Sequence, residues 1–405
     1  MSKIDFSNID YQITFIEKLE LKITGTTTFS NKIIEAELEK KNGVSYFKLN
    51  IVEEAEFQEV EFNLKNTDFE LLVNGYITAR RNSIEVKKKT SYRYSEGIIS
   101  DYKHINWNEN NDYYFTSYYL NSDSHLLASQ FGNKNVLTIR ILNRGISLIK
   151  DDHHLIIKSI DKLNFDLFSE ISYNILVSLG FISGHFIQDE VYIFQSSDIL
   201  ELSNIFKYRK LRSGFKSIYH SMVWNPYGYK HLIGSECADK LYKNKTLVCF
   251  DEKSFTRLLE LCYNNSQIQY AMVLFNESNS NNLSLLVKNN CFYAVLEVLK
   301  KFFHKVNGSL LSKDYSQKGN IQKFKLIFST VIEIDNDEIQ TLEKRNVFLH
   351  GDIEGIEDSE MIDLMLKQIT LIYKLLLSHI GFEGYIIDHY HIRKFNTEKA
   401  FMKIN

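Results

Sequence analysis

The first 150 residues carry a strand-like pattern, in which short runs rich in β-branched and aromatic residues are separated by turn residues. Residues 33–41 and 44–52 flank Asn42-Gly43, a dipeptide typical of a two-residue hairpin turn. The other expected strands are residues 11–24, 70–79, 83–88, 113–120 and 136–149. Their number and spacing predict a β-rich N-terminal module over residues 1–150, built as a sandwich or a barrel.

Residues 151–250 show a mixed pattern that predicts an α/β connecting region. Apolar residues recur at helical spacing over residues 165–179, and Gly180 follows as a candidate left-handed cap. Residues 190–194 are expected to be extended. The one proline of the chain, Pro226, falls in the turn-like run of residues 224–228.

After residue 251 the apolar residues follow helical spacing in four segments, approximately residues 255–275, 283–303, 324–350 and 359–380. The third segment is expected to break near Asp335, because Glu338 three residues later completes a capping box. Gly351 and Gly381 stand where helices commonly end. The fold class is therefore α+β and multidomain, with an up-and-down bundle of four helices over residues 251–390.

Composition and charge narrow the functional class. The net charge is −3, which argues against a protein that coats nucleic acid with a uniformly basic surface. The chain has no uninterrupted run of 18 apolar residues and no apolar signal segment at its start, so a cytoplasmic protein without a membrane partner is expected. The four cysteines lack a paired C-x-x-C spacing and are expected to be reduced, mostly buried thiols.

The run Arg345-Asn346-Val347-Phe348-Leu349-His350 is the informative chemical feature of the chain. Asn346 and His350 are four residues apart and share one helical face, whereas Arg345 lies about 140° round the helix from His350 and must reach the same pocket with its long side chain. Cleavage of RNA without a metal needs a base for the 2′-hydroxyl, an acid for the leaving oxygen and a cation for the phosphate. A histidine and an arginine supply these groups.

On these residues, the C-terminal part of the chain resembles a HEPN domain, the higher-eukaryote and prokaryote nucleotide-binding family, whose signature is an Arg-polar-x-x-x-His run in its third main helix. Tyr293-Ala294-Val295-Leu296-Glu297 resembles the recurring acidic position of that family. Together with a β-rich N-terminal module, residues 179–184 and the Asn225-Pro226-Tyr227 turn, the run resembles the ApeA-like proteins of bacterial anti-phage defence.

This resemblance implies a metal-independent endoribonuclease that needs no cofactor. It implies a homodimer through the C-terminal bundle, with two Arg/His runs facing one composite cleft on an RNA substrate. His350 would be the acid or base, Arg345 would hold the phosphate, and Asn346 would orient the histidine or the ribose. Glu297 is expected to pair with Arg345 and orient its guanidinium. The N-terminal module would sense a trigger, such as a phage product, and control the nuclease in abortive infection.

The neutral total conceals local differences in charge. Residues 1–200 carry −7, residues 201–250 carry +6 and residues 251–405 carry −2. Residues 300–325 hold seven lysines against one acidic residue, Asp314. We expect Lys300, Lys301, Lys305 and Lys344 to bind the phosphates of the substrate. More commonly, a lysine-rich run of this kind forms a solvent-exposed helix face without a binding role.

Other interpretations compete with these. Arg345 and His350 could be a surface pair that stabilises a helix end, in a bundle that only binds or dimerises, or the nuclease could be a toxin restrained by a separate antitoxin. The histidines of residues 151–154 and 388–391 lack a convincing third metal ligand, so no metal site is expected. The aromatic residues 113–119 could stack on bases, but core packing in a strand explains them better.

Overall fold

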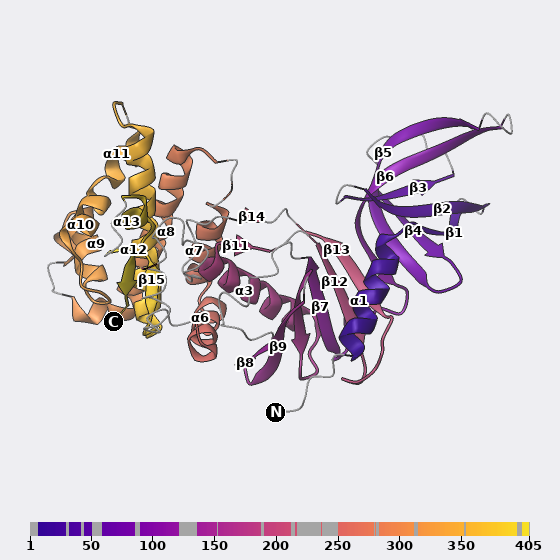
Figure 1. Cartoon of the computed structure of the whole chain (residues 1–405), viewed down its shortest axis with the longest axis horizontal. Coiled ribbons are helices and arrows are strands. Elements are labelled where there is room, and N and C mark those ends of the chain that lie inside the picture. The colour runs from indigo at the N-terminus through magenta and orange to yellow at the C-terminus, as the bar shows by residue number, and fades with distance from the viewer. Residues whose placement is uncertain are drawn as a thin grey trace.

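The computed structural model describes residues 7–404 of the chain, apart from short internal segments. These segments are residues 30–31, 42–43, 51–58, 86–89, 121–135, 152, 188–189, 212–214, 217–235, 237–249, 279, 281–282, 312–314, 352–353 and 395–398. At residues 29, 80–85, 90–93, 120, 215–216, 350 and 401 only the backbone is described. The protein is α+β: a β-barrel, a second group of strands and a helical region follow one another along its longest axis (Figure 1).

Six antiparallel strands close the barrel near the start of the chain. They are β1 (Ile23–Phe29), β2 (Lys32–Lys41), β3 (Val44–Leu49), β4 (Glu59–Lys65), β5 (Glu70–Glu85) and β6 (Thr90–His104). Their order is β3-β2-β1-β4-β5-β6, and β3 pairs with β6 to close the ring. Alternate residues of β3 and β4 are buried, because one face of each strand points into the barrel. The predicted β-rich N-terminal region is confirmed, in its barrel form.

Glycines leave room for an aromatic ring inside the barrel. Phe47 is buried and lies 5.4 Å from Phe62 between ring centroids. A Cβ atom at Gly97 would lie 2.3 Å from the Phe47 ring and 2.3 Å from the carbonyl oxygen of Tyr76. Gly97 is therefore required where β6 passes over the ring.

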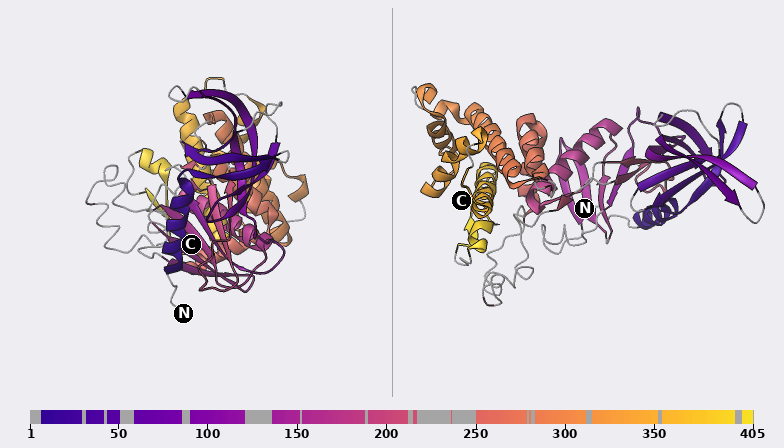
Figure 2. Two further views of the ribbon diagram at one scale, coloured as in Figure 1. Left: turned by 90° about the vertical axis from the view of Figure 1, so that its right-hand side faces the viewer. Right: turned by 90° about the horizontal axis from the view of Figure 1, so that it is seen from above.

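The strand β6 continues out of the barrel into a second set of strands. Beyond β6 these are, in order, β13 (Phe206–Lys210), β12 (Glu190–Ser196), β7 (Tyr114–Leu120), β10 (His154–Ser159), β9 (Arg144–Lys150) and β8 (Val136–Ile141). The helix α1 (Ser7–Glu20) covers one face of this part of the sheet, and α3 (Phe165–Ser183) covers the other (Figures 1 and 2). Phe115, Tyr118 and Tyr119 of β7 are buried, which confirms core packing for these three aromatic residues.

A buried polar network joins the barrel to the second set of strands. Lys40 on β2 forms ion pairs with Glu190 on β12 and with Glu20 on α1, the latter at 2.7 Å. The hydroxyl of Tyr208 donates to Glu190 at 2.9 Å and lies 3.0 Å from the hydroxyl of Ser45. Because Glu190 is almost completely buried, this network holds the two parts of the sheet in one arrangement.

The helix α3 joins the strands to the helical region. Asn164 caps its start, with a side chain that accepts a hydrogen bond from the backbone of Leu167, and Gly184 with φ 68° caps its end. The predicted end at Gly180 is wrong by one turn. A Cβ atom there would lie 2.9 Å from the side-chain amide of Asn276, so Gly180 allows close packing of α3 on the next helices rather than capping. Among the described residues, α3 is the one helix long and apolar enough to span a membrane, and most of it is buried inside the protein.

The helical region follows from residue 252. Its helices are α6 (Glu252–Asn264), α7 (Ser266–Glu277), α8 (Leu285–Asn307), α9 (Asn320–Phe328), α10 (Asn336–Glu343), α11 (Arg345–His350), α12 (Asp358–His379) and α13 (His389–Arg393). Short elements complete the chain: β11 (His185–Phe186), β14 (Phe215–Lys216), the 3-10 turns η3 (Gly308–Leu310) and η4 (Tyr315–Gln317), β15 (Tyr385–Ile387) and β16 (Phe401–Lys403). One hydrophobic core runs from the second set of strands through α3 into these helices.

The two longest helices, α8 and α12, run in the same direction. Asn289 near the start of α8 donates to the carbonyl of Met361 near the start of α12, and the Phe303 ring near the end of α8 packs on His379 at the end of α12. The segment between them runs the opposite way, since Glu338 contacts α12 at Lys374 and Lys344 contacts it at Glu360. The segment that carries Arg345 therefore returns along both long helices.

Several expected element boundaries are corrected by the structure. Residues 11–20 belong to α1 rather than to a strand, residues 136–149 form two strands around Leu142 and Asn143, both with positive φ, and residues 255–275 form two helices. Residues 324–350 form three helices, with the predicted capping box of Asp335 and Glu338 present. The turn of residues 224–228, Cys237 and Cys249 lie outside the described residues.

Candidate functional site

Local packing fixes the position of Arg345. The helix α10 ends at Glu343, Lys344 joins it to α11, and Gly351 with φ 77° follows the last residue of α11, His350. Phe348 of α11 is buried against the Tyr293 ring of α8, at 6.1 Å between centroids, and the Tyr293 hydroxyl donates to the carbonyl of Thr341 at 2.7 Å. These contacts hold the first turn of α11 beside the middle of α8.

Arg345 meets Glu297 at this crossing. The guanidinium Nε lies 2.7 Å from Glu297 Oε1, so the ion pair expected from the family resemblance is present. Lys300 Nζ lies 2.7 Å from Glu297 Oε2 and donates to Asn320 Oδ1 at 2.6 Å. Asn320 donates in turn to Glu297 at 3.2 Å, and Lys300 sits 4.1 Å from the Phe324 ring centroid. One carboxylate thus organises two cations and an amide.

Burial and pairing set the protonation state of this cluster. Burial alone would raise the pKa of Glu297, but hydrogen bonds from Lys300 and Asn320 and the charges of Lys300 and Arg345 outweigh it and lower this pKa below its ordinary value. For Lys300, burial lowers the pKa of the ammonium despite its contact with Glu297. Glu297 is therefore ionised at neutral pH and acts as an anchor for cations, not as a proton donor.

The exposed face of α11 lies beside this anchor. Arg345 donates from a terminal nitrogen to Asn346 Oδ1 at 2.9 Å, and Asn346 is exposed. Position 350 is one turn further along, on the same helical face as Asn346. The structure describes the backbone of His350, and the placement of its imidazole lies outside what is described.

The predicted substrate-binding lysines divide into two groups. Lys300 is largely buried and directs its ammonium to Glu297, whereas Lys301 and Lys305 are exposed on α8. Lys344 lies at the junction of α10 and α11, half-exposed, 3.1 Å from Glu360. Counting Arg345 and Lys300 against Glu297 leaves one positive charge at the crossing, which suits a bound phosphate.

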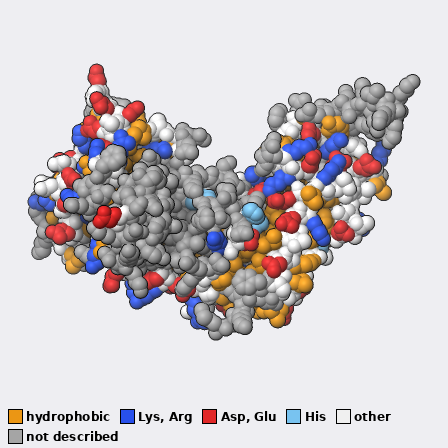
Figure 3. Space-filling model, in the orientation of Figure 1, with side chains coloured by type: hydrophobic (Ala, Val, Ile, Leu, Met, Phe, Trp, Pro, Cys, Tyr) orange, Lys and Arg blue, Asp and Glu red, His pale blue; other side chains and the backbone are white. Residues whose placement is uncertain are grey.

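The charges elsewhere on the surface are mixed. On the face shown in Figure 3, acidic and basic side chains are intermixed over the described parts of both the barrel and the helical region. This pattern agrees with the small net charge of the chain. An anion would therefore be attracted by a local cluster rather than by the whole face.

The histidine-rich runs form local carboxylate contacts. His154 Nδ1 lies 3.3 Å from Asp151, and His391 Nδ1 lies 2.8 Å from Asp388, whose side chain also caps α13. Among the described residues no group of three His, Cys, Asp or Glu side chains could hold a metal ion. Cys262 and Cys291, the two cysteines within the described ranges, are free thiols.

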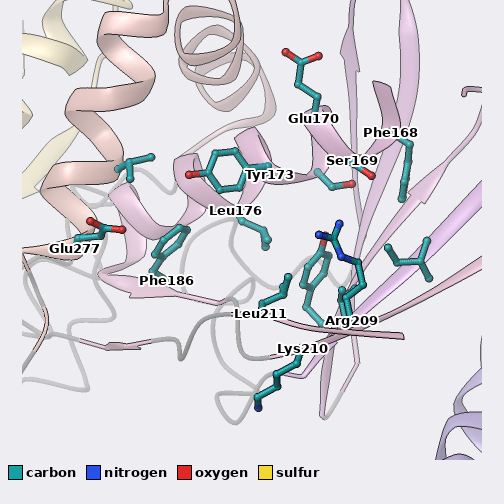
Figure 4. Close-up of a pocket in the computed structure, with 15 residues that line it drawn as sticks. Phe168, Ser169, Glu170, Tyr173, Leu176, Phe186, Arg209, Lys210, Leu211 and Glu277 are labelled. Carbon is teal, nitrogen blue, oxygen red and sulfur yellow. The ribbon is translucent and has the colours of Figure 1, made fainter. Parts of the chain in front are cut away.

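A second candidate site, which sequence reasoning missed, is a cavity of about 930 Å³ beside α3 (Figure 4). Its walls come from α3, from β7, β12 and β13, and from α7. No local sequence pattern marks it, because its residues are spread over residues 119–277 and meet only in the fold. The excess of positive charge in residues 201–250 was the one available signal, since Arg209 and Lys210 line the cavity.

Comparison with known proteins identifies no relative of this chain. The chain matches no protein-family model, and no curated protein or solved structure shows significant similarity to it.

Proposed function

We propose that the helical region is a HEPN-type, metal-independent endoribonuclease with its active site on α11. The observation that carries the proposal is the Arg345–Glu297 ion pair, which holds a guanidinium at the start of the helix on which exposed Asn346 shares a face with position 350. The excess positive charge at the crossing supports binding of a phosphate. The resemblance of the run from Arg345 to His350 to the family signature supplies the reaction class.

In this proposal the residues divide the work of cleaving RNA. Arg345 binds the non-bridging oxygens of the phosphate and stabilises the charge that develops on them. His350 takes the proton of the 2′-hydroxyl or gives a proton to the leaving 5′-oxygen, and Asn346 orients the histidine or the ribose. Glu297 positions Arg345. The second acid or base comes from water or from a partner subunit, in a homodimer that pairs two α11 helices.

The biological role we propose is an effector of anti-phage defence. A nuclease that acts on the RNA of its own cell must be restrained, and here the N-terminal region would restrain it until a phage-derived trigger is sensed. One continuous core extends from the second set of strands through α3 into the helical region, and a conformational change in the strands could reach the helices through it. A toxin-type nuclease restrained by a separate antitoxin is the related alternative.

A non-catalytic binding protein is the candidate from another class. It is favoured by one observation: Arg345 already forms an ion pair with Glu297 and donates a hydrogen bond to Asn346, so part of its charge and of its hydrogen-bonding capacity is used within the protein. In that case the cluster would only stabilise the crossing of α8 and α11.

The test compares the wild type with His350→Ala. The matched control is His153→Ala, at an exposed histidine that is distant in sequence from His350. Cells expressing each are followed for growth and RNA integrity, with and without phage, and the purified proteins are incubated with RNA in the presence of EDTA. We expect cleavage with 2′,3′-cyclic phosphate ends in wild type and His153→Ala only. Intact RNA in all three under every condition refutes the nuclease, and cleavage abolished by EDTA refutes the metal-free mechanism. Toxicity without phage that a neighbouring gene relieves favours the toxin.

A further inference from the structure

The cavity beside α3 combines apolar walls with one directed cation. Phe168 and Leu176 of α3, Phe186 of β11, Val191 and Ile193 of β12, and Leu211 give it an apolar lining, and Tyr119 and Tyr173 add aromatic rings. Its volume of about 930 Å³ is in the range of pockets that hold small organic molecules. The lining therefore suits a ligand with an aliphatic or aromatic body.

Arg209 provides the polar end of this cavity. Figure 4 shows its guanidinium pointing into the space toward Ser169, while Lys210 points away from it. Among the described residues no carboxylate forms an ion pair with Arg209, in contrast to Arg345 and Arg393. A guanidinium in an apolar-walled cavity that no described carboxylate pairs with is a site for an anionic group.

The other polar groups of the cavity define the orientation of such a ligand. The Ser169 hydroxyl is buried and has no hydrogen-bond partner in the described structure, so a ligand oxygen held by Arg209 could accept from it. Glu277 lies at the opposite end from Arg209 in Figure 4, and the Glu170 carboxylate accepts a hydrogen bond from Tyr263 at 3.1 Å. Glu277 would disfavour a negative group at its own end of the cavity, which leaves the Arg209 end for the negative group of a ligand.

We propose that this cavity binds a small amphipathic organic anion, with its carboxylate or phosphate on Arg209 and Ser169 and its apolar body against α3 and β12. The site is formed jointly by the strands and by α7 of the helical region, so an occupant contacts both parts of the protein at once. This assignment does not depend on the nuclease proposal, because it concerns residues remote in sequence from Arg345 and would hold for a non-catalytic protein as well.

The test uses 1-anilinonaphthalene-8-sulfonate, an aromatic anion whose fluorescence rises in apolar surroundings, titrated into the full chain. We expect saturable binding at one site and affinity about tenfold weaker in Arg209→Gln, since a charge-assisted hydrogen bond is lost. Arg144→Gln, at an exposed arginine in the β8–β9 hairpin, is the matched control and should bind as the wild type does. Ser169→Phe, which fills the cavity from α3 without removing core atoms, should abolish binding.

Competition separates the sources of the anion. Displacement of the probe by octanoate but not octanol identifies an aliphatic carboxylate, and displacement by adenosine 5′-monophosphate identifies an aromatic phosphate. Equal affinity of Arg209→Gln and Arg144→Gln, or unchanged binding in a Ser169→Phe protein with wild-type circular dichroism, overturns the proposal.

Discussion

Glu297→Gln isolates the contribution of one carboxylate to the crossing of α8 and α11. The substitution keeps the size of the side chain and removes its charge, which leaves Arg345 and Lys300 facing a neutral amide. The carboxylate receives both cations at 2.7 Å and the amide of Asn320 at 3.2 Å. The Arg345 side chain is 18% exposed and the Lys300 side chain 12%, so both ion pairs are intermediate between surface and buried pairs. We therefore expect Glu297→Gln to lower the free energy of opening of this crossing by about 2 kcal/mol.

Hydrogen–deuterium exchange read on peptides from α8 and α11 measures this loss locally, which suits a protein whose several parts need not unfold in one step. A loss of about 2 kcal/mol corresponds to exchange about 30-fold faster for amides that open with α11. Glu343→Gln, an exposed position at the end of α10, is the matched control and should change little. If both variants exchange alike in α11, the ion pair does not hold the helix and our account of Arg345 is refuted.

The same variant has a defined pH dependence. The folded state lowers the pKa of Glu297, so the stability contributed by its ionised carboxyl is complete above the ordinary value of 4.5 and is lost as the pH falls through the folded-state pKa. The difference between wild type and Glu297→Gln should therefore be constant across neutral pH and shrink below pH 4.5. A difference that grows on acidification would contradict this assignment.

Three further substitutions test other parts of the structure. Arg345→Lys should reduce the rate of RNA cleavage by about 100-fold or more, because the ammonium of lysine cannot form the paired hydrogen bonds that the planar guanidinium makes with a phosphate. Full activity of this variant would show that Arg345 has only a structural role. Gly97→Ala should destabilise the barrel by about 3 kcal/mol in thermal or urea denaturation, because the Cβ of the alanine would overlap the Phe47 ring and the backbone. The control Gly319→Ala should be tolerated, since the space around Gly319 is open. Glu190→Gln should cost about 3 kcal/mol in the same assay because it leaves a lysine of β2 without its buried partner, and a wild-type melting curve would refute the network as a joint between barrel and strands.

Features that depend on neighbouring residues were predictable. The β2–β3 hairpin around residues 42–43 follows from turn preference, and the start of α10 follows from the Asp335–Glu338 capping box, which the structure confirms. Gly351 ends α11 with positive φ, as its position after the apolar run indicated. The Arg345–Glu297 contact was expected from a family resemblance, and no spacing rule along the chain would have produced it.

Residues 11–20 show where local preference fails. Their β-branched and aromatic content favours a strand, yet Ile9, Gln12, Ile16 and Leu19 are buried at helical spacing, and the segment forms α1 on the sheet. Intrinsic preferences amount to fractions of a kcal/mol per residue, so burial of one helical face on a sheet outweighs them. The extent of α3 past Gly180 was also decided by packing, here against Asn276.

Short-range patterns along the chain are enough to predict the β2–β3 hairpin, the capping box of α10 and the chemical groups at residues 345–350, because these depend on residues within a few positions of one another. Packing of the folded chain is what closes β3 on β6, brings Asn320 to Glu297 and turns Arg209 toward an apolar cavity beside α3. These contacts join residues tens of positions apart. They form only when the core brings distant segments together, and local preference carries no information about that.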